Sequence, residues 1–248
     1  MAKEWPRSRV EGMDITPTRS QIVPANCHIH VDDIRSKDWW GLANGYTYDY
    51  IHTRMSMGIF PDFREIIQKS YNNLEPGGWM ESQEIYPTVY CDDGTMPDDW
   101  PLKQWSQDQD EAAHDILGIP LRIANKLQKW YEQAGFVEVK ERIFRIPILE
   151  WAKEPQLKLL GKFMVENMQQ GLYGWSVNYF HRAFGWTENE TRVRLAQVYN
   201  SLNDKSVHAY YKIYVVYGRK PREGEAPSQV PKPENWPTPE TAFDDGEF

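Results

Sequence analysis

The chain has 248 residues, of which 40% are hydrophobic and 26% charged, and its formal net charge is −8. The size and composition are typical of a globular protein with a sizeable core, and we expect one domain with insertions. The negative charge argues against nucleic-acid binding, which requires a basic surface, and no apolar run reaches the roughly 20 residues that span a bilayer. Two cysteines, Cys27 and Cys91, are too few for a disulfide scaffold, and the N-terminus lacks the apolar stretch of a secretory signal, so we expect a cytoplasmic or nuclear protein.

The first part of the chain alternates short strand-like runs with linkers. Strands are predicted over 8–14, 27–31 and 48–53, an arrangement that favours a parallel sheet. An amphipathic helix follows over 63–74, because its apolar residues recur at the spacing of one helical face. The Pro-Gly-Gly sequence within 75–78 is predicted to end that helix before a strand over 79–85.

Helices dominate the prediction for the second part. Residues 86–120 are rich in Asp, Pro and Trp, and we interpret them as an irregular insertion. Predicted next are a helix over 123–134 ended by Gly135, a strand over 136–143, a helix over 157–175, a helix with a capping box from Thr187 to Glu190, and a strand over 207–217. The acidic, Pro-rich tail over 221–248 is predicted to be disordered.

Eight short motifs follow one another along the chain in a specific order. They are VEGMDITP at 10–17, VPANC at 23–27 leading to Asp32 and Asp33, YDYIHTR at 48–54, LEPGGWME at 74–81, CDDGT at 91–95, WYEQAGF at 130–136, SVHAYY at 206–211 and VYGRKP at 216–221. In this order and spacing they resemble the fungal LaeA-like methyltransferases, a group of class I S-adenosylmethionine-dependent enzymes associated with secondary metabolism.

The resemblance implies an α/β fold, the Rossmann-like class I methyltransferase fold with a mixed sheet. The methyltransferase-like domain would cover 1–220, with a helical cap inserted at about 154–203. Family members carry a glycine-rich cofactor loop after the first strand, some twenty residues before an aspartate that binds the ribose. Here Gly12 is the sole glycine before Asp14, so the first strand and this loop are missing. Either the sequence starts downstream of the true start, or the gene product is truncated.

The resemblance also implies S-adenosyl-L-methionine as cofactor and a set of residues that bind it. Asp14 would accept the ribose hydroxyls, with Ile15 beside it. Asp33, or its competitor Asp32, would accept the adenine amino group, with Ile34 packing near the ring. From the residues alone, Asp14 could equally be a solvated turn residue.

His52 and Arg54 follow the strand that passes beside the methionine part of the cofactor in this family. Either side chain could face the cofactor carboxylate, or could be a partly buried, paired residue. Methyl transfer mainly requires positioning of the acceptor, and a base is needed only where the acceptor must lose a proton. The conceivable bases are Glu81, Glu84, Tyr86, His114 and His181, and none is singled out as catalytic.

The function expected is methylation of a small-molecule acceptor in fungal secondary metabolism. The alternative is a catalytically inactive protein that keeps the fold as a binding or regulatory partner in a protein complex. A third possibility arises because His28, His30 and Asp32 would share one face of a strand, as in part of a metallo-hydrolase zinc motif. The motif's next histidine is replaced by Asp33, and no later ligand cluster is evident, so no metal is predicted.

Overall fold

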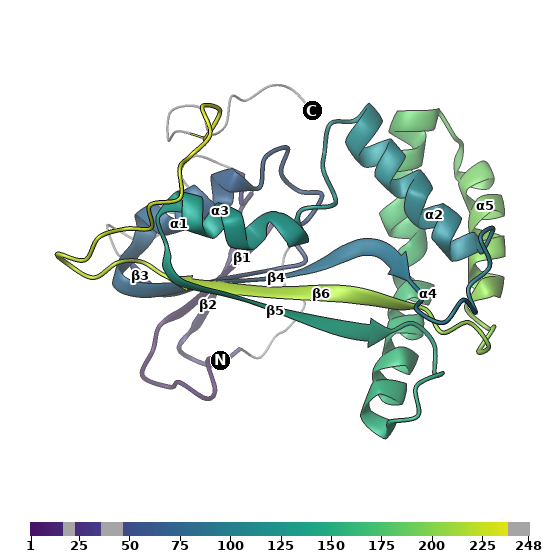
Figure 1. Ribbon diagram of the computed structural model, residues 1–248, viewed down its shortest axis with the longest axis horizontal. Coiled ribbons are helices and arrows are strands. Elements are labelled where there is room, and N and C mark those ends of the chain that lie inside the picture. Colours follow the sequence, from purple (N-terminus) through teal and green to yellow (C-terminus); the bar gives the residue numbers. More distant parts are fainter. Residues whose placement is uncertain (17–22, 36–46, 238–248) are drawn as a thin grey trace. The chain divides into compact units, whose positions relative to one another are not determined.

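The computed structural model describes residues 1–16, 23–35 and 47–237 (Figure 1). The chain divides into two compact units, one of residues 1–47 with 237–248, and one of residues 48–236. Each unit is described by itself below.

The first unit contains a two-stranded parallel sheet. Its strands are β1 (Val10–Asp14) and β2 (Cys27–Val31), and their register pairs Asp14 with Val31. The two strands confirm the predicted parallel pairing. Because the strands are parallel and end together, the residues that follow them lie at one edge of the sheet.

The second unit is built on a four-stranded mixed sheet in the order β3-β4-β6-β5. The strands are β3 (Tyr48–Arg54), β4 (Leu74–Tyr90), β5 (Val137–Pro147) and β6 (Tyr210–Arg219). β3 and β4 are parallel, whereas β6 runs antiparallel to both β4 and β5. Among the described residues, β3 pairs with β4 alone, so it is an edge strand.

Two short helices, α1 (Arg64–Asn73) and α3 (Leu127–Ala134), cover one face of this sheet (Figure 1). A single 3₁₀ turn at Ala124–Lys126 leads into α3. Tyr131 of α3 is fully buried, and its hydroxyl lies 2.7 Å from Ser82 Oγ on β4. Gly135 ends α3 with φ 111°, a left-handed conformation that favours glycine, as predicted.

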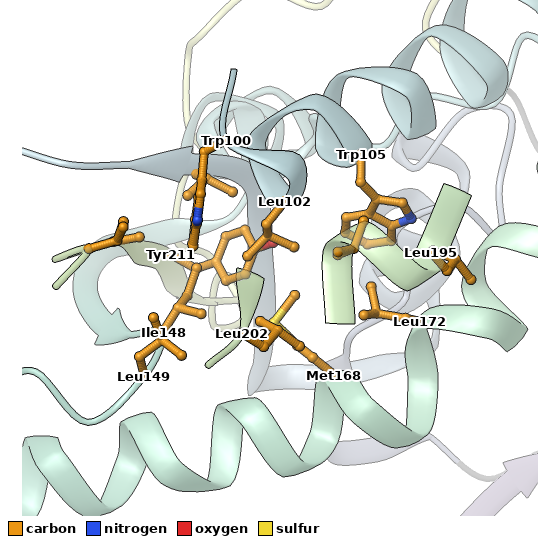
Figure 2. Packing of buried hydrophobic residues seen from close by; sticks show 14 of the residues in the cluster. Trp100, Leu102, Trp105, Ile148, Leu149, Met168, Leu172, Leu195, Leu202 and Tyr211 are labelled. Carbon is orange, nitrogen blue, oxygen red and sulfur yellow. The ribbon is translucent and has the colours of Figure 1, made fainter. Parts of the chain in front are cut away.

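The remaining helices gather at the end of β4 and β5 (Figure 1). They are α2 (Pro101–Asp110) with its π-helical extension Glu111–Ile116, α4 (Pro155–Phe184) and α5 (Glu188–Ser201). Buried side chains from these helices, from β6 and from adjoining loops make one apolar core (Figure 2). They include Trp100, Leu102, Trp105, Ile148, Leu149, Met168, Leu172, Leu195, Leu202 and Tyr211. The predicted helical cap is therefore a packed helical layer that also contains α2.

The prediction of an irregular insertion over 86–120 is wrong in two places. β4 continues to Tyr90, and α2 starts with Pro101 in its first turn. Leu102 and Trp105 lie three residues apart and are both buried, so α2 has a short apolar face. The sequence does not predict this helix because its other positions are Pro, Lys, Gln, Ser and Asp, which gives the segment the composition of a loop.

Two smaller points concern where helices and strands begin and end, and one of them differs from the prediction. The Pro-Gly-Gly sequence does not form a separate turn, because β4 begins at Leu74, directly after α1. The capping box that begins α5 is confirmed: Thr187 Oγ1 accepts from the Glu190 N–H, and the Glu190 carboxylate accepts from the Thr187 N–H.

Part of the predicted disordered tail is ordered. Residues 221–237 carry defined contacts with α1 and α3: Gln133 Nε2 donates to the Pro231 carbonyl, and the buried indole of Trp236 donates to Gln68 Oε1. Prolines do not prevent an extended segment from packing, and Trp236 supplies the apolar anchor. The prediction of disorder is therefore wrong for these residues, while 238–248 lie outside the described residues.

Candidate functional site

Five predicted cofactor residues lie at the carboxyl ends of β1 and β2. Asp14 is the last residue of β1 and is exposed, with Oδ1 accepting the Thr16 N–H at 2.8 Å. Ile15 next to it is 70% exposed. Asp32 directly follows β2, and its backbone N–H donates to the Asp14 carbonyl at 3.1 Å. The two strand ends therefore bring the predicted ribose and adenine residues to one edge.

Asp33 is already engaged in an ion pair. Its carboxylate accepts from Nε and Nη2 of Arg35, with the shortest distance 2.7 Å, and also from the Arg35 N–H. These hydrogen bonds to Arg35 lower the pKa of Asp33. Ile34, between the two, is partly buried. Four hydrogen bonds from Arg35 already reach the roughly four acceptor positions of this carboxylate, so Arg35 would have to release one before Asp33 accepted a further donor.

His52 and Arg54 belong to β3, in the second unit. The His52 ring stacks on Tyr50, with ring centroids 6.3 Å apart, and its Nε2 lies 3.9 Å from Glu81 Oε1 on β4. Burial lowers the pKa of His52. Arg54 is exposed at the carboxyl end of the strand. Arg54 therefore lies at the strand end that a ligand of this fold would approach, whereas His52 is a mid-strand residue.

A shallow pocket opens beside His52 on the face of the sheet where Tyr50 and Glu81 lie. It has a volume of about 370 Å³ and is lined by Asp49, Tyr50, Trp79, Glu81 and Tyr217. Burial, helped by the neighbouring Glu81, raises the pKa of Tyr50 to about 12. No sequence motif predicts this pocket, because its residues come from three different strands.

The conceivable bases occupy very different environments. Glu84 is fully buried, and its carboxylate accepts backbone N–H groups of Ser56 and Met57 in the loop after β3. His181 Nδ1 lies 3.1 Å from the Trp186 carbonyl, at the end of α4. Tyr86 belongs to a cluster of tyrosine rings on the sheet. Glu81 lines the pocket, and His114 is exposed in the π-helical segment.

The His28–His30–Asp32 pattern does not build a metal site. Within the part of the chain that the structure describes, no group of three or more His, Cys, Asp or Glu side chains is placed to hold a metal ion. His28 is exposed, and the buried Nε2 of His30 has no hydrogen-bond partner among the described residues.

The parallel strand pair ended by acidic residues, and the mixed sheet with its helical cap, agree with the fold that the motifs imply. Comparison with protein families decides the assignment. The family described as "Methyltransferase domain" matches residues 1–141, more than half of the chain. The chain belongs to this family. Its α/β architecture is that of the class I methyltransferases.

Curated relatives of this methyltransferase-domain protein come from fungi, and some of them are named as regulators of secondary metabolism. Methyltransferase pytC of Aspergillus terreus is 32% identical over 222 residues, which are 89% of this chain and 67% of pytC. The secondary metabolism regulator LAE1 of Cochliobolus heterostrophus is 28% identical over 226 residues, which are 90% of this chain and 72% of LAE1. For the regulator laeA of Aspergillus fumigatus the identity is 24%, and this chain spans 58% of its length.

Comparison with solved structures gives matches at low identity and with TM-scores below 0.5. The YcgJ protein of Bacillus is 12% identical, with a TM-score of 0.46 and coverage of 90% of this chain and 87% of that chain. A Haemonchus contortus phosphoethanolamine N-methyltransferase 2, solved with S-adenosyl-L-methionine, is 14% identical, with a TM-score of 0.36 and coverage of 71% and 34%. Separately, none of the helices in the described part of the methyltransferase-domain chain has both the length and the apolar character needed to cross a membrane.

Proposed function

We propose that the protein is an S-adenosylmethionine-dependent methyltransferase that methylates a small-molecule acceptor in fungal secondary metabolism. The observation that carries this proposal is the position of Asp14, an exposed carboxylate at the carboxyl end of a parallel strand. Open α/β sheets bind ligands at this edge. The family and the names of the fungal relatives support the same conclusion.

The acidic residues at the ends of β1 and β2 suit the adenosine part of the cofactor. One carboxylate oxygen of Asp14 accepts a hydrogen bond from the Thr16 N–H. The carboxylate has further acceptor positions, which suit the two ribose hydroxyls. Hydrogen bonds to a charged acceptor contribute about 1.5–3 kcal/mol each. Asp33, or Asp32 next to it, would accept the adenine amino group, and Ile15 and Ile34 would supply apolar contact to the ring. This fit concerns the adenosine part of the cofactor.

Within the second unit, the family resemblance assigns His52 and Arg54 to the methionine part of the cofactor. Arg54 is a permanent cation at the carboxyl end of β3 and suits a carboxylate. His52 is neutral near pH 7, because burial lowers its pKa, and would act as a hydrogen-bonding group. The bound cofactor supplies a methyl group on a positively charged sulfur. The protein's task is then to hold the acceptor in line with that methyl group, which can lower the barrier by about 7–11 kcal/mol.

The alternative is that the protein keeps the fold but acts as a binding partner in a regulatory complex. The names of the relatives LAE1 and laeA, which are regulators, favour this second candidate. Calorimetric titration of the full chain with S-adenosylmethionine separates the two. Micromolar binding supports the enzyme, whereas no heat at millimolar ligand rejects it and leaves the binding partner.

A further inference from the structure

The loop after β3, residues 55–60, has an unusual backbone. Met55 has φ 53° and Gly58 has φ 78°, both in the left-handed region. A Cβ at Gly58 would lie 2.7 Å from the Tyr179 hydroxyl, so the loop also approaches α4 closely. Such a conformation persists only where surrounding contacts enforce it.

Glu84 on β4 supplies one of these contacts. Its Oε1 and Oε2 accept the Ser56 N–H at 3.0 and 2.9 Å, and Oε2 also accepts the Met57 N–H at 3.1 Å. The side chain is completely buried. A buried carboxylate is costly unless it is hydrogen-bonded, and here the only described donors are loop amides.

No hydrogen bond or ion pair from a cation reaches Glu84 in the part of the chain that the structure describes. Two phenols lie near it: that of Tyr131 on α3, whose pKa the Glu84 charge helps to raise, and that of Tyr214, the residue opposite Glu84 on β6. Among the described residues, no charged side chain shifts the pKa of Glu84. Burial raises this pKa to about 7, while the loop amides act in the opposite direction.

Tyr179 of α4 holds the loop from the other side. Its hydroxyl donates to the Gly58 carbonyl at 3.1 Å. The loop is thus fixed both to the sheet, through Glu84, and to the helical layer, through Tyr179. It follows Arg54, at the strand end to which the proposed function assigns the methionine part of the cofactor.

We propose that Glu84 is a positioning residue, not a base: its carboxylate holds the loop 55–60, together with Tyr179, in the conformation that the cofactor site needs. This inference rests on the proposed function for its link to the cofactor. A proton on Glu84 competes with the loop amides. The protonated oxygen becomes a donor that faces the donors Ser56 N–H and Met57 N–H, so the loop loses one of its acceptors.

Glu84→Gln tests this directly, because glutamine is the isostere of the protonated acid at every pH. In the full chain, amide hydrogen exchange at Ser56 and Met57 should be at least about fivefold faster in Glu84→Gln than in wild type at about pH 8, and the difference should shrink at about pH 6. Glu141→Gln is the matched control. Glu141 on β5 also has a pKa raised by burial but does not contact the loop, so its variant should exchange like wild type.

S-adenosylhomocysteine affinity gives the functional readout. The wild type should bind this probe at least about fivefold more weakly at about pH 6 than at about pH 8, whereas Glu84→Gln should be weak at both values. Tyr179→Phe, which keeps the ring, should also speed exchange in the loop. Equal loop exchange in wild type and both variants overturns the positioning role. Faster loop exchange without any binding of the probe by wild type rejects the methyltransferase proposal and the link to the cofactor, and leaves only the anchoring of the loop.

Discussion

The indole Nε1–H of Trp105 on α2 donates a 2.8 Å hydrogen bond to Ser176 Oγ on α4. The same oxygen also accepts from Gln109 Nε2 at 3.0 Å. All three side chains are buried. One hydroxyl therefore satisfies two buried donors and joins α2 to the long helix of the helical layer.

Ser176→Ala should lower the free energy of unfolding by about 2–4 kcal/mol, because the buried Trp105 Nε1–H loses its acceptor and Gln109 Nε2 keeps only the Trp175 carbonyl. Denaturant unfolding measures this loss. Ser201→Ala is the control: Ser201 is also buried, but its hydroxyl donates only to the Val198 carbonyl of its own helix, and its removal should cost less than about 1 kcal/mol. Equal losses in the two variants would contradict the assigned role of Ser176.

This helix–helix contact also shows which kind of element the sequence alone does not predict. Elements with a clear apolar period, a cap or a terminal glycine were predicted well, as α1, α5 and Gly135 demonstrate. α2 was missed because its buried positions include Ser106 and Gln109, whose polar groups are satisfied only by partners distant in the sequence. Local pattern cannot reveal such a partner.

Part of the candidate site could likewise be located from the sequence, and part could not. The acidic residues at the ends of β1 and β2 could be located because a strand followed by Asp is a local signal. The contact between Glu84 and the loop joins residues 28 positions apart, and a buried glutamate in a strand resembles any other glutamate in the sequence. The motif resemblance supplied the roles of Asp14 and Asp33, which remain proposals.

Gly161 and Gly174 on α4 provide a second matched pair. A Cβ at Gly161 would lie 1.8 Å from the carbonyl oxygen of Leu149, whereas a Cβ at Gly174 would meet no atom within 4 Å. Gly161→Ala should therefore destabilise the protein by more than about 3 kcal/mol. Gly174→Ala should stabilise it by up to about 1 kcal/mol, because alanine favours the helix. Thermal unfolding of both variants checks the signs, and a neutral Gly161→Ala would contradict the close approach.

Glu84 predicts how stability depends on pH. Its pKa is about 7 in the folded protein against 4.5 for a free side chain, so the unfolded chain releases this proton first as the pH rises. The contribution of Glu84 to the free energy of unfolding is therefore full below about pH 4.5 and falls by about 3 kcal/mol as the pH rises to about 7. Unfolding of Glu84→Gln should lack this component. The same pH slope in wild type and variant would show that Glu84 does not carry it.

The most direct test of the central claim is the affinity for S-adenosylhomocysteine when the carboxylate at the end of β1 is neutralised. Asp14→Asn should weaken calorimetric binding at least about tenfold, since it removes the charge from the hydrogen bonds to the ribose. Asp98→Asn, at an exposed position near α2, should bind like wild type. Binding by wild type that is lost selectively in Asp14→Asn is the predicted result, and equal affinity in wild type and Asp14→Asn would contradict the account.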